Sequence, residues 1–250
     1  MSAVAILKIG STTTALLVAN ELSAPLLYQQ RVVNLFDSDA PKRLNDVLAD
    51  FTRFADNHGC SRRLAAGGEA VRQCPPLHAV IKRWGWPHWA VDGELEGHLT
   101  WFAVKASEGL MDWVIDIGGG STEFASADQI VSLPVGAATQ QTVYDWPEGI
   151  YATAPYVVGG TAHALSILIG NRQLLQTDIG QLKEAVQANP TLLDFMDPVR
   201  RRIFPQGLQV LYDIMQYYHW PLVTYTPYGY IHGIWLACTL GRNISLRGGA

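Results

Sequence analysis

The residues best suited to chemistry lie together in one short stretch of the sequence. An apolar run carries an acid near its end, and glycines, hydroxyls and a second acid follow: Asp116, Gly118, Gly119, Gly120, Ser121, Thr122 and Glu123. Glycines let backbone N–H groups turn toward an anion, and the two hydroxyls add donors. Asp116 and Glu123 are positioned to hold a divalent cation or to orient a water beside a phosphate. The alternative is a tight hairpin whose glycines serve only the turn, and the flanking acids and hydroxyls weigh against it.

Strands are predicted on both sides of this stretch. Residues 113–117 form an apolar run before it, and residues 123–127 and 130–134 form two more after it. The N-terminus repeats this order, because apolar runs at residues 4–9 and 15–19 flank a turn of serine and threonine. This weak internal repeat suggests two related lobes that face one another.

The remaining elements are mostly helical in pattern. Apolar residues at helical spacing predict helices at residues 44–57, 77–83, 161–168, 179–189, 191–197, 206–217 and 230–240. Further strands are predicted at residues 26–36, 63–67 and 222–225, and an edge strand within residues 85–91. The sequence has no long linker and no low-complexity segment.

Composition and charge limit the classes of protein. Of the 250 residues, 48% are hydrophobic, so the chain has ample material for a buried core and is not disordered throughout. The net charge of −4 argues against a generic nucleic-acid or anionic-membrane binder, which normally carries a basic excess. No uncharged apolar run reaches the roughly 20 residues that a membrane span needs. Any site for a polyanion must therefore be local.

The cysteines and the N-terminus predict a cytoplasmic protein. Cys60, Cys74 and Cys238 are scattered and odd in number, which is typical of reduced thiols. Lys8 interrupts the first apolar run too early for a signal peptide.

The stretch around Asp116 resembles the second phosphate motif of the exopolyphosphatase/guanosine-pentaphosphate phosphohydrolase family, which has the actin/hexokinase/Hsp70-like fold. Other landmarks of that family recur in order along nearly the whole chain. They are residues 6–13 (the first phosphate motif), 67–72, 91–99, 132–136, 159–162, 205–207 and 228–229.

The resemblance implies a role for each matching residue. Glu96 takes the place of the catalytic glutamate, and Arg72 that of a phosphate-binding arginine. The residues implied to bind phosphate through the turns are Gly10, Ser11, Gly118, Gly119, Gly120, Ser121, Thr122, Gly159, Gly160 and Thr161. Asp116 and Glu123, with position 8, form the implied metal or charge site, and the implied cofactor is magnesium.

The chain departs from the family pattern at several positions. Lys8 stands where the family has an aspartate that helps to hold the metal, and Thr12 stands where it has asparagine. The closing pattern also lacks its acids and its base: Pro227 and His232 replace the acids. A lysine at position 8 supplies a fixed positive charge, so the sequence predicts that magnesium binding is weakened and that turnover is reduced.

The sequence thus predicts an α/β protein of two ribonuclease-H-like lobes with a phosphate cleft between them. The lobes are placed at residues 1–105 and 106–250, with the closing helix at residues 230–240 packing back on the first lobe. The leading function is hydrolysis of the terminal phosphoanhydride of polyphosphate or guanosine pentaphosphate. A weak or inactive phosphate or nucleotide sensor is the first alternative, and a small-metabolite kinase is the second. By resemblance, a homodimer is expected.

Overall fold

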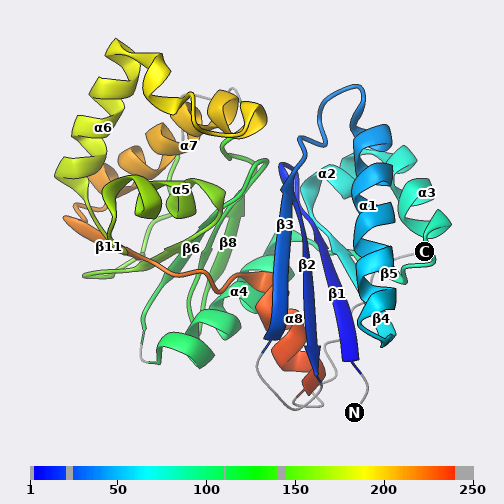
Figure 1. Ribbon diagram of the computed structural model, residues 1–250. Helices are drawn as coiled ribbons and strands as arrows, with labels where there is room; N and C mark the ends of the chain where they lie inside the picture. Colours follow the sequence, from blue (N-terminus) through cyan, green and yellow to red (C-terminus); the bar gives the residue numbers. More distant parts are fainter. Residues whose placement is uncertain (1–2, 21–24, 110, 140–144, 240–250) are drawn as a thin grey trace. The chain divides into compact units, whose positions relative to one another are not determined.

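The computed structural model describes residues 3–20, 25–109, 111–139 and 145–239. These residues form two compact units, each a mixed β-sheet with helices (Figure 1). The first unit contains residues up to Glu96 together with the segment that begins at Ile231, and the second contains Gly97–Tyr230. The predicted α/β class is therefore confirmed. The structure divides within a helix after Glu96, whereas the sequence predicts a division after residue 105.

The first unit is built on a five-stranded sheet of order β3-β2-β1-β4-β5. Its elements are β1 (Ala3–Ile9), β2 (Thr13–Asn20), β3 (Pro25–Val32), α1 (Ala40–Asn57), β4 (Cys60–Gly67), α2 (Glu69–Gln73), α3 (Pro75–Arg83), β5 (His88–Ala90) and α8 (Tyr230–Thr239). Alternate residues of β1, such as Leu7 and Ile9, pack with α1 and α3 in one core. On α8, the His232 ring stacks on Tyr28 of β3, with ring centroids 5.7 Å apart. Residue 240 of the predicted closing helix lies outside the described residues.

The second unit is built on a six-stranded sheet of order β10-β11-β9-β6-β7-β8. Its elements are β6 (Val114–Ile117), β7 (Thr122–Ala125), β8 (Ile130–Leu133), β9 (Tyr156–Val158), α5 (Gly160–Ile169), β10 (Gln173–Leu175), α6 (Gln176–Ala188), the short 3₁₀ helix η1 (Pro190–Leu193), α7 (Pro198–Tyr217) and β11 (Leu222–Tyr225). Helix α4 (Gly93–Glu108) joins the two units without a break. Ile115 and Phe124 on one face of this sheet pack with α5 and α7.

Several elements differ from those predicted from the sequence. Helix α4 and the short elements α2, β9 and β10 were not predicted. The helix predicted at residues 191–197 is only η1, because Pro190 begins a single tight turn and Asp197 caps the next helix. No helix in the described part of the chain has both the length and the apolar character that a membrane crossing requires.

The internal repeat appears in the strands. In each unit, three consecutive antiparallel strands run side by side, β1-β2-β3 in the first and β6-β7-β8 in the second. Both first turns close with the same hydrogen bond, from Gly10 N to Thr13 O at 3.0 Å and from Gly118 N to Ser121 O at 2.9 Å. Lys8 and Asp116, each two residues before the turn glycine, are therefore equivalent positions.

The predicted site segments all follow the carboxyl ends of parallel strands. In the first unit β1, β4 and β5 are parallel, and the segments after them carry Gly10, Arg72 and Glu96. In the second unit β6, β9 and β11 are parallel, and the segments after them begin at Gly118, Gly159 and Thr226. This edge is where open α/β sheets bind their ligands.

Candidate active site

Two carboxylates face each other across the β6–β7 hairpin. Asp116 and Glu123 are directly opposite in the antiparallel register, so their side chains leave the same face of the sheet. Both are buried, at 3% and 1% exposure. Glu123 accepts a hydrogen bond from Ser132 Oγ at 2.9 Å, and Asp116 accepts one from Thr100 Oγ1 at 3.3 Å. Two carboxyl groups directly opposite on a buried face are an unusual choice for a hairpin, because like charges at such positions are destabilising.

Helix α4 covers this face and brings a third carboxylate to it. Its Gly97 packs so closely on the sheet that an added Cβ would lie 2.7 Å from Ile130 Cγ2 and 3.5 Å from Glu123 Cβ. Thr100, one turn later, reaches Asp116. Glu96 precedes Gly97 in the same unbroken helix, so the packing of Gly97 places the backbone of Glu96 beside this face.

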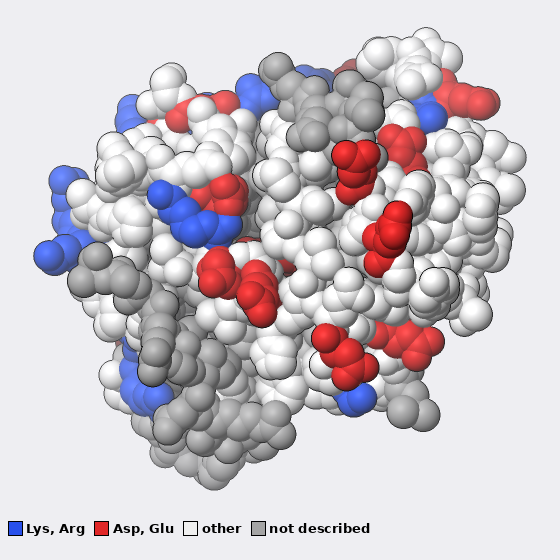
Figure 2. Space-filling model, turned by 180° about the vertical axis from the view of Figure 1, so that it is seen from behind, with Lys and Arg blue, Asp and Glu red and all other residues white. Residues whose placement is uncertain are grey.

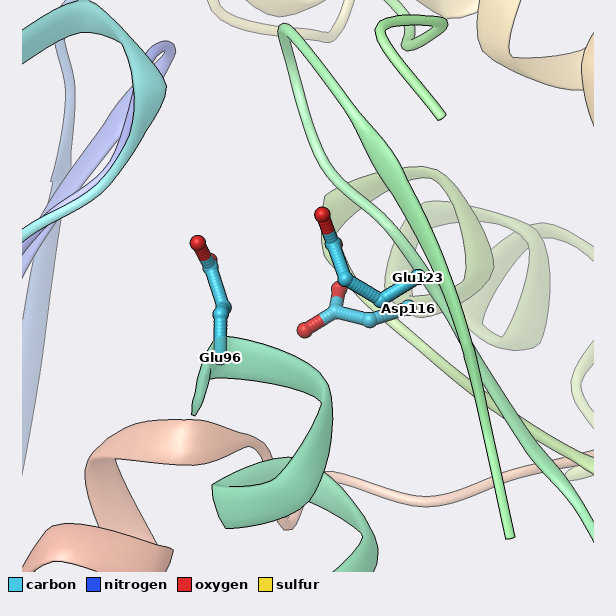
Figure 3. A group of neighbouring side chains, drawn as sticks. All are labelled: Glu96, Asp116 and Glu123. Atoms are coloured by element: carbon cyan, nitrogen blue, oxygen red, sulfur yellow. The ribbon is translucent and has the colours of Figure 1, made fainter. Parts of the chain in front are cut away.

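The three carboxylates form one acidic group (Figure 3). Oxygen atoms of Glu96, Asp116 and Glu123 all lie within 4.8 Å of one another, and Glu96 is also buried, at 8% exposure. Carboxylate oxygens this close together, on side chains this poorly hydrated, form a donor set that a cation can bridge. Hard oxygen donors suit magnesium, which is usually bound through one or two carboxylates and keeps several waters. The donor set therefore fits a divalent cation.

The glycine turn beside Asp116 presents backbone donors. The carbonyls of Gly118 and Gly119 accept hydrogen bonds from Ala137 N (2.9 Å) and Ala138 N (2.7 Å), which hold the turn in place. Thr122 Oγ1 donates to Val135 O at 2.6 Å, so this hydroxyl serves the fold. Within the described residues, no hydrogen bond is found for the amides of Gly119, Gly120 and Ser121. Three successive amides of this kind suit an anion.

The β9–α5 turn lies beside the same acid. Gly159 has φ +100° and ψ 170°, a conformation open essentially only to glycine, and an added Cβ would lie 3.2 Å from Asp116 Oδ1. Gly160 is the first residue of α5. The N–H groups of the first turn of a helix have no hydrogen-bond partner within that helix, so they can bind a ligand. Thr161 is buried with its hydroxyl against Gly207 of α7, and this hydroxyl has no hydrogen-bond partner among the described residues.

The first unit holds the other predicted residues. Gly10 and Ser11 form the β1–β2 turn, which is held by hydrogen bonds from Leu35 N to Ser11 O (2.8 Å) and from Val33 N to Thr12 O (3.0 Å). Arg72, on α2, donates to the Val91 carbonyl and pairs with Glu69. These contacts orient its guanidinium, and the fork carries further donors.

Arg200 is a residue of this region that the sequence analysis missed. Its guanidinium lies against the first turn of α5, where an added Cβ at Gly160 would be 2.2 Å from Nη1. Burial lowers the pKa of Arg200, and the charge of Asp197 opposes this shift. One signal was available: Arg200, Arg201 and Arg202 crowd the start of α7, where the helix dipole disfavours positive charge.

We expect His163 to make the second unit sensitive to acid. Burial, and then the charge of Arg200, lower the pKa of His163 below its ordinary value of 6.5. Below about pH 6.5 the unfolded chain therefore binds a proton that the folded chain resists. The free energy of unfolding should fall, by at most about 1.4 kcal/mol per pH unit, until the folded pKa is reached.

Urea unfolding of His163→Gln between pH 7.5 and 5 tests this expectation. The variant should lose part of the acid slope that the wild type shows. An unchanged slope in His163→Gln would contradict it.

Part of the chain is similar in sequence to known proteins. Residues 24–145 match the Ppx/GppA phosphatase family. An uncharacterised protein of Streptomyces coelicolor is 32% identical over 160 residues, which are 53% of this chain and 47% of that protein. The match thus spans about half the length of that relative.

Solved structures of the family share the fold. An exopolyphosphatase from Cytophaga hutchinsonii is 18% identical with a TM-score of 0.81, covering 96% of this chain and 98% of that one. The Ppx/GppA family member from Aquifex aeolicus is 19% identical with a TM-score of 0.75, covering 97% and 99%. The fold is therefore the predicted two-lobed fold of the actin/hexokinase/Hsp70 type. Residues 24–145 thus match the Ppx/GppA phosphatase family in sequence, and nearly the whole length of the chain has the fold of the solved structures described above.

Proposed function

We propose that this protein hydrolyses the terminal phosphoanhydride of inorganic polyphosphate or of a guanosine polyphosphate. The acidic group of Glu96, Asp116 and Glu123, next to a turn with three successive amides, is the observation that carries the proposal. Hydrolysis of a phosphoanhydride needs the phosphoryl group held, its charge compensated and a water aligned. The two features supply groups suited to these tasks.

The chain's own residues divide the work as follows. The amides of Gly119, Gly120 and Ser121 hold the oxygens of the terminal phosphoryl group. Arg72 adds a planar cationic fork. Glu96, buried in the first turn of α4, accepts a proton from the attacking water. Magnesium bound by Asp116 and Glu123 would supply charge compensation at the phosphoryl oxygens.

The surface agrees with a local site for a polyanion. Among the described residues of the face drawn in Figure 2, acidic and basic side chains are scattered or in small groups, without a continuous basic surface. Long-range attraction of nucleic acid is therefore not a feature of this face. A cytoplasmic location and a homodimer remain predictions from the sequence.

A catalytically weak phosphate or nucleotide sensor is the second candidate. Lys8 favours it, because a lysine stands where the family has a metal-binding carboxylate. Pro227 also favours it, since the closing segment keeps a structural hydrogen bond from Thr226 Oγ1 to Glu108 Oε1 (2.7 Å) but has no acid at position 227.

Phosphate release and binding, measured together, separate the two candidates. Orthophosphate is assayed after addition of long-chain polyphosphate or guanosine pentaphosphate, with magnesium or with chelator, and binding of each compound is measured by calorimetry. The proposal predicts release that requires magnesium from at least one compound. Binding without release in all four conditions would select the sensor.

A further inference from the structure

The acidic pair of the second unit has no counterpart in the first. The β1–β2 and β6–β7 hairpins have the same register, so Lys8 and Ala15 stand where Asp116 and Glu123 stand. Where the β6–β7 hairpin has two carboxylates, the β1–β2 hairpin therefore has the cation of Lys8 and the methyl group of Ala15. The first unit's positions do not fit a metal ion, whereas those of the second unit do.

The Lys8 side chain runs toward the phosphate turn of its own unit. Its neighbours Leu7 and Ile9 point into the core with α1, so Lys8 leaves the opposite face of β1. Directly beside it in the sheet stand Ala15 on β2 and Ala66 on β4, whose small side chains leave room for the lysine stem. Lys8 Cε reaches to 3.4 Å from the position that a Cβ of Gly10 would take.

The turn that Lys8 approaches is fixed by backbone hydrogen bonds within its own unit. Its carbonyls at Ser11 and Thr12 are occupied by Leu35 N and Val33 N, and its closing bond runs from Gly10 N to Thr13 O. The acceptors of the turn are therefore used within the fold. Lys8 is half-buried, so water would only weakly screen the attraction between its ammonium and a phosphate group in contact with it.

We infer that Lys8 binds a phosphate group directly through its ammonium, without a metal ion. At the equivalent position of the second unit, Asp116 would act on phosphate through a metal ion that it binds. The ligand is the terminal phosphate group of a phosphoanhydride, so the inference rests on the proposed function and refines it. A lysine binds phosphate as a point charge and tolerates several orientations of the group. The phosphate group then binds before magnesium and does not require it. Magnesium would still be bound by the acidic group of Glu96, Asp116 and Glu123.

Calorimetric titration with inorganic tripolyphosphate in the presence of chelator tests the inference. The wild-type protein should bind, and Lys8→Met should weaken binding by about 10- to 100-fold, because a charge-assisted contact is lost. Lys8→Arg should keep most of the affinity. Lys42→Met is the matched control: it removes the same charge from an exposed position of α1 and should bind as the wild type does. Lys8→Asp should bind only after magnesium is added.

Two results would overturn the inference: wild-type binding that disappears with chelator, or equal binding by Lys8→Met and Lys42→Met. Thermal unfolding of each variant verifies that it is folded. If Lys8→Met does not fold, the binding of tripolyphosphate by Lys8→Arg is compared with that by Lys8→Asp instead. Failure of the proposed function looks different. In that case no orthophosphate is released under any condition, while the loss of tripolyphosphate binding in Lys8→Met still occurs.

Discussion

Glu96→Gln should lose about 10²–10⁴-fold in turnover while it still binds polyphosphate. The amide keeps the shape of the side chain but cannot accept a proton from water. Because Glu96 lies in the first turn of α4 and Gly97 anchors this helix on the sheet, the exchange should leave the fold intact. Steady-state release of orthophosphate, together with calorimetric binding, measures both quantities.

Glu94→Gln is the control for this substitution. Glu94 lies in the same helical turn but is exposed, so its exchange removes an equal charge without touching the acidic group. Its turnover should stay within about twofold of the wild type. Equal turnover in Glu96→Gln and the wild type would remove Glu96 from the mechanism.

Gly159→Ala should be strongly destabilising. The backbone of Gly159 (φ +100°, ψ 170°) costs a non-glycine residue about 1–3 kcal/mol. The added Cβ would also lie 2.3 Å from the carbonyl oxygen of Ile117, in the strand that carries Asp116. We therefore expect a loss of more than about 2 kcal/mol in the free energy of unfolding, and loss of activity from the folded fraction.

Gly160→Ala provides the comparison for Gly159→Ala. Here the three atoms nearest to the new Cβ all belong to the Arg200 guanidinium, which is the movable end of a long side chain. The loss of stability should remain below about 1 kcal/mol. Chemical unfolding of both variants measures the difference, and equal losses at the two glycines would show that the backbone of Gly159 is not strained.

The sequence predicted the elements whose pattern is local. Strands such as β1 and β11 are apolar runs between turn residues, and β11 has the predicted bounds, Leu222–Tyr225. Helix α4 was missed because its inward face is built from Gly97, Thr100 and Val104, small residues that give no strong apolar stripe. The strands β9 and β10 have three residues each, too few for a period to be seen, and pairing with neighbours defines them.

For the site, the hairpin could be predicted and its surroundings could not. The sequence between Asp116 and Glu123 is a turn between strands, so the carboxylates were expected to be close. That Glu96 joins them depends on the contact of Gly97 with Ile130, which is tertiary packing. The same holds for Arg200, whose contact with Gly160 links α7 to α5. The roles of the predicted phosphate-binding residues remain predictions.

Hydrolysis in ¹⁸O-labelled water tests the central claim most directly. Wild-type protein is incubated with long-chain polyphosphate or guanosine pentaphosphate and magnesium, and the released orthophosphate is analysed by mass. Attack by water on the terminal phosphorus predicts one labelled oxygen in each orthophosphate released, from at least one compound, and about 10²–10⁴-fold slower release by Glu96→Gln. Absence of release from both compounds, or transfer of the phosphoryl group to an added acceptor without label, would contradict the account.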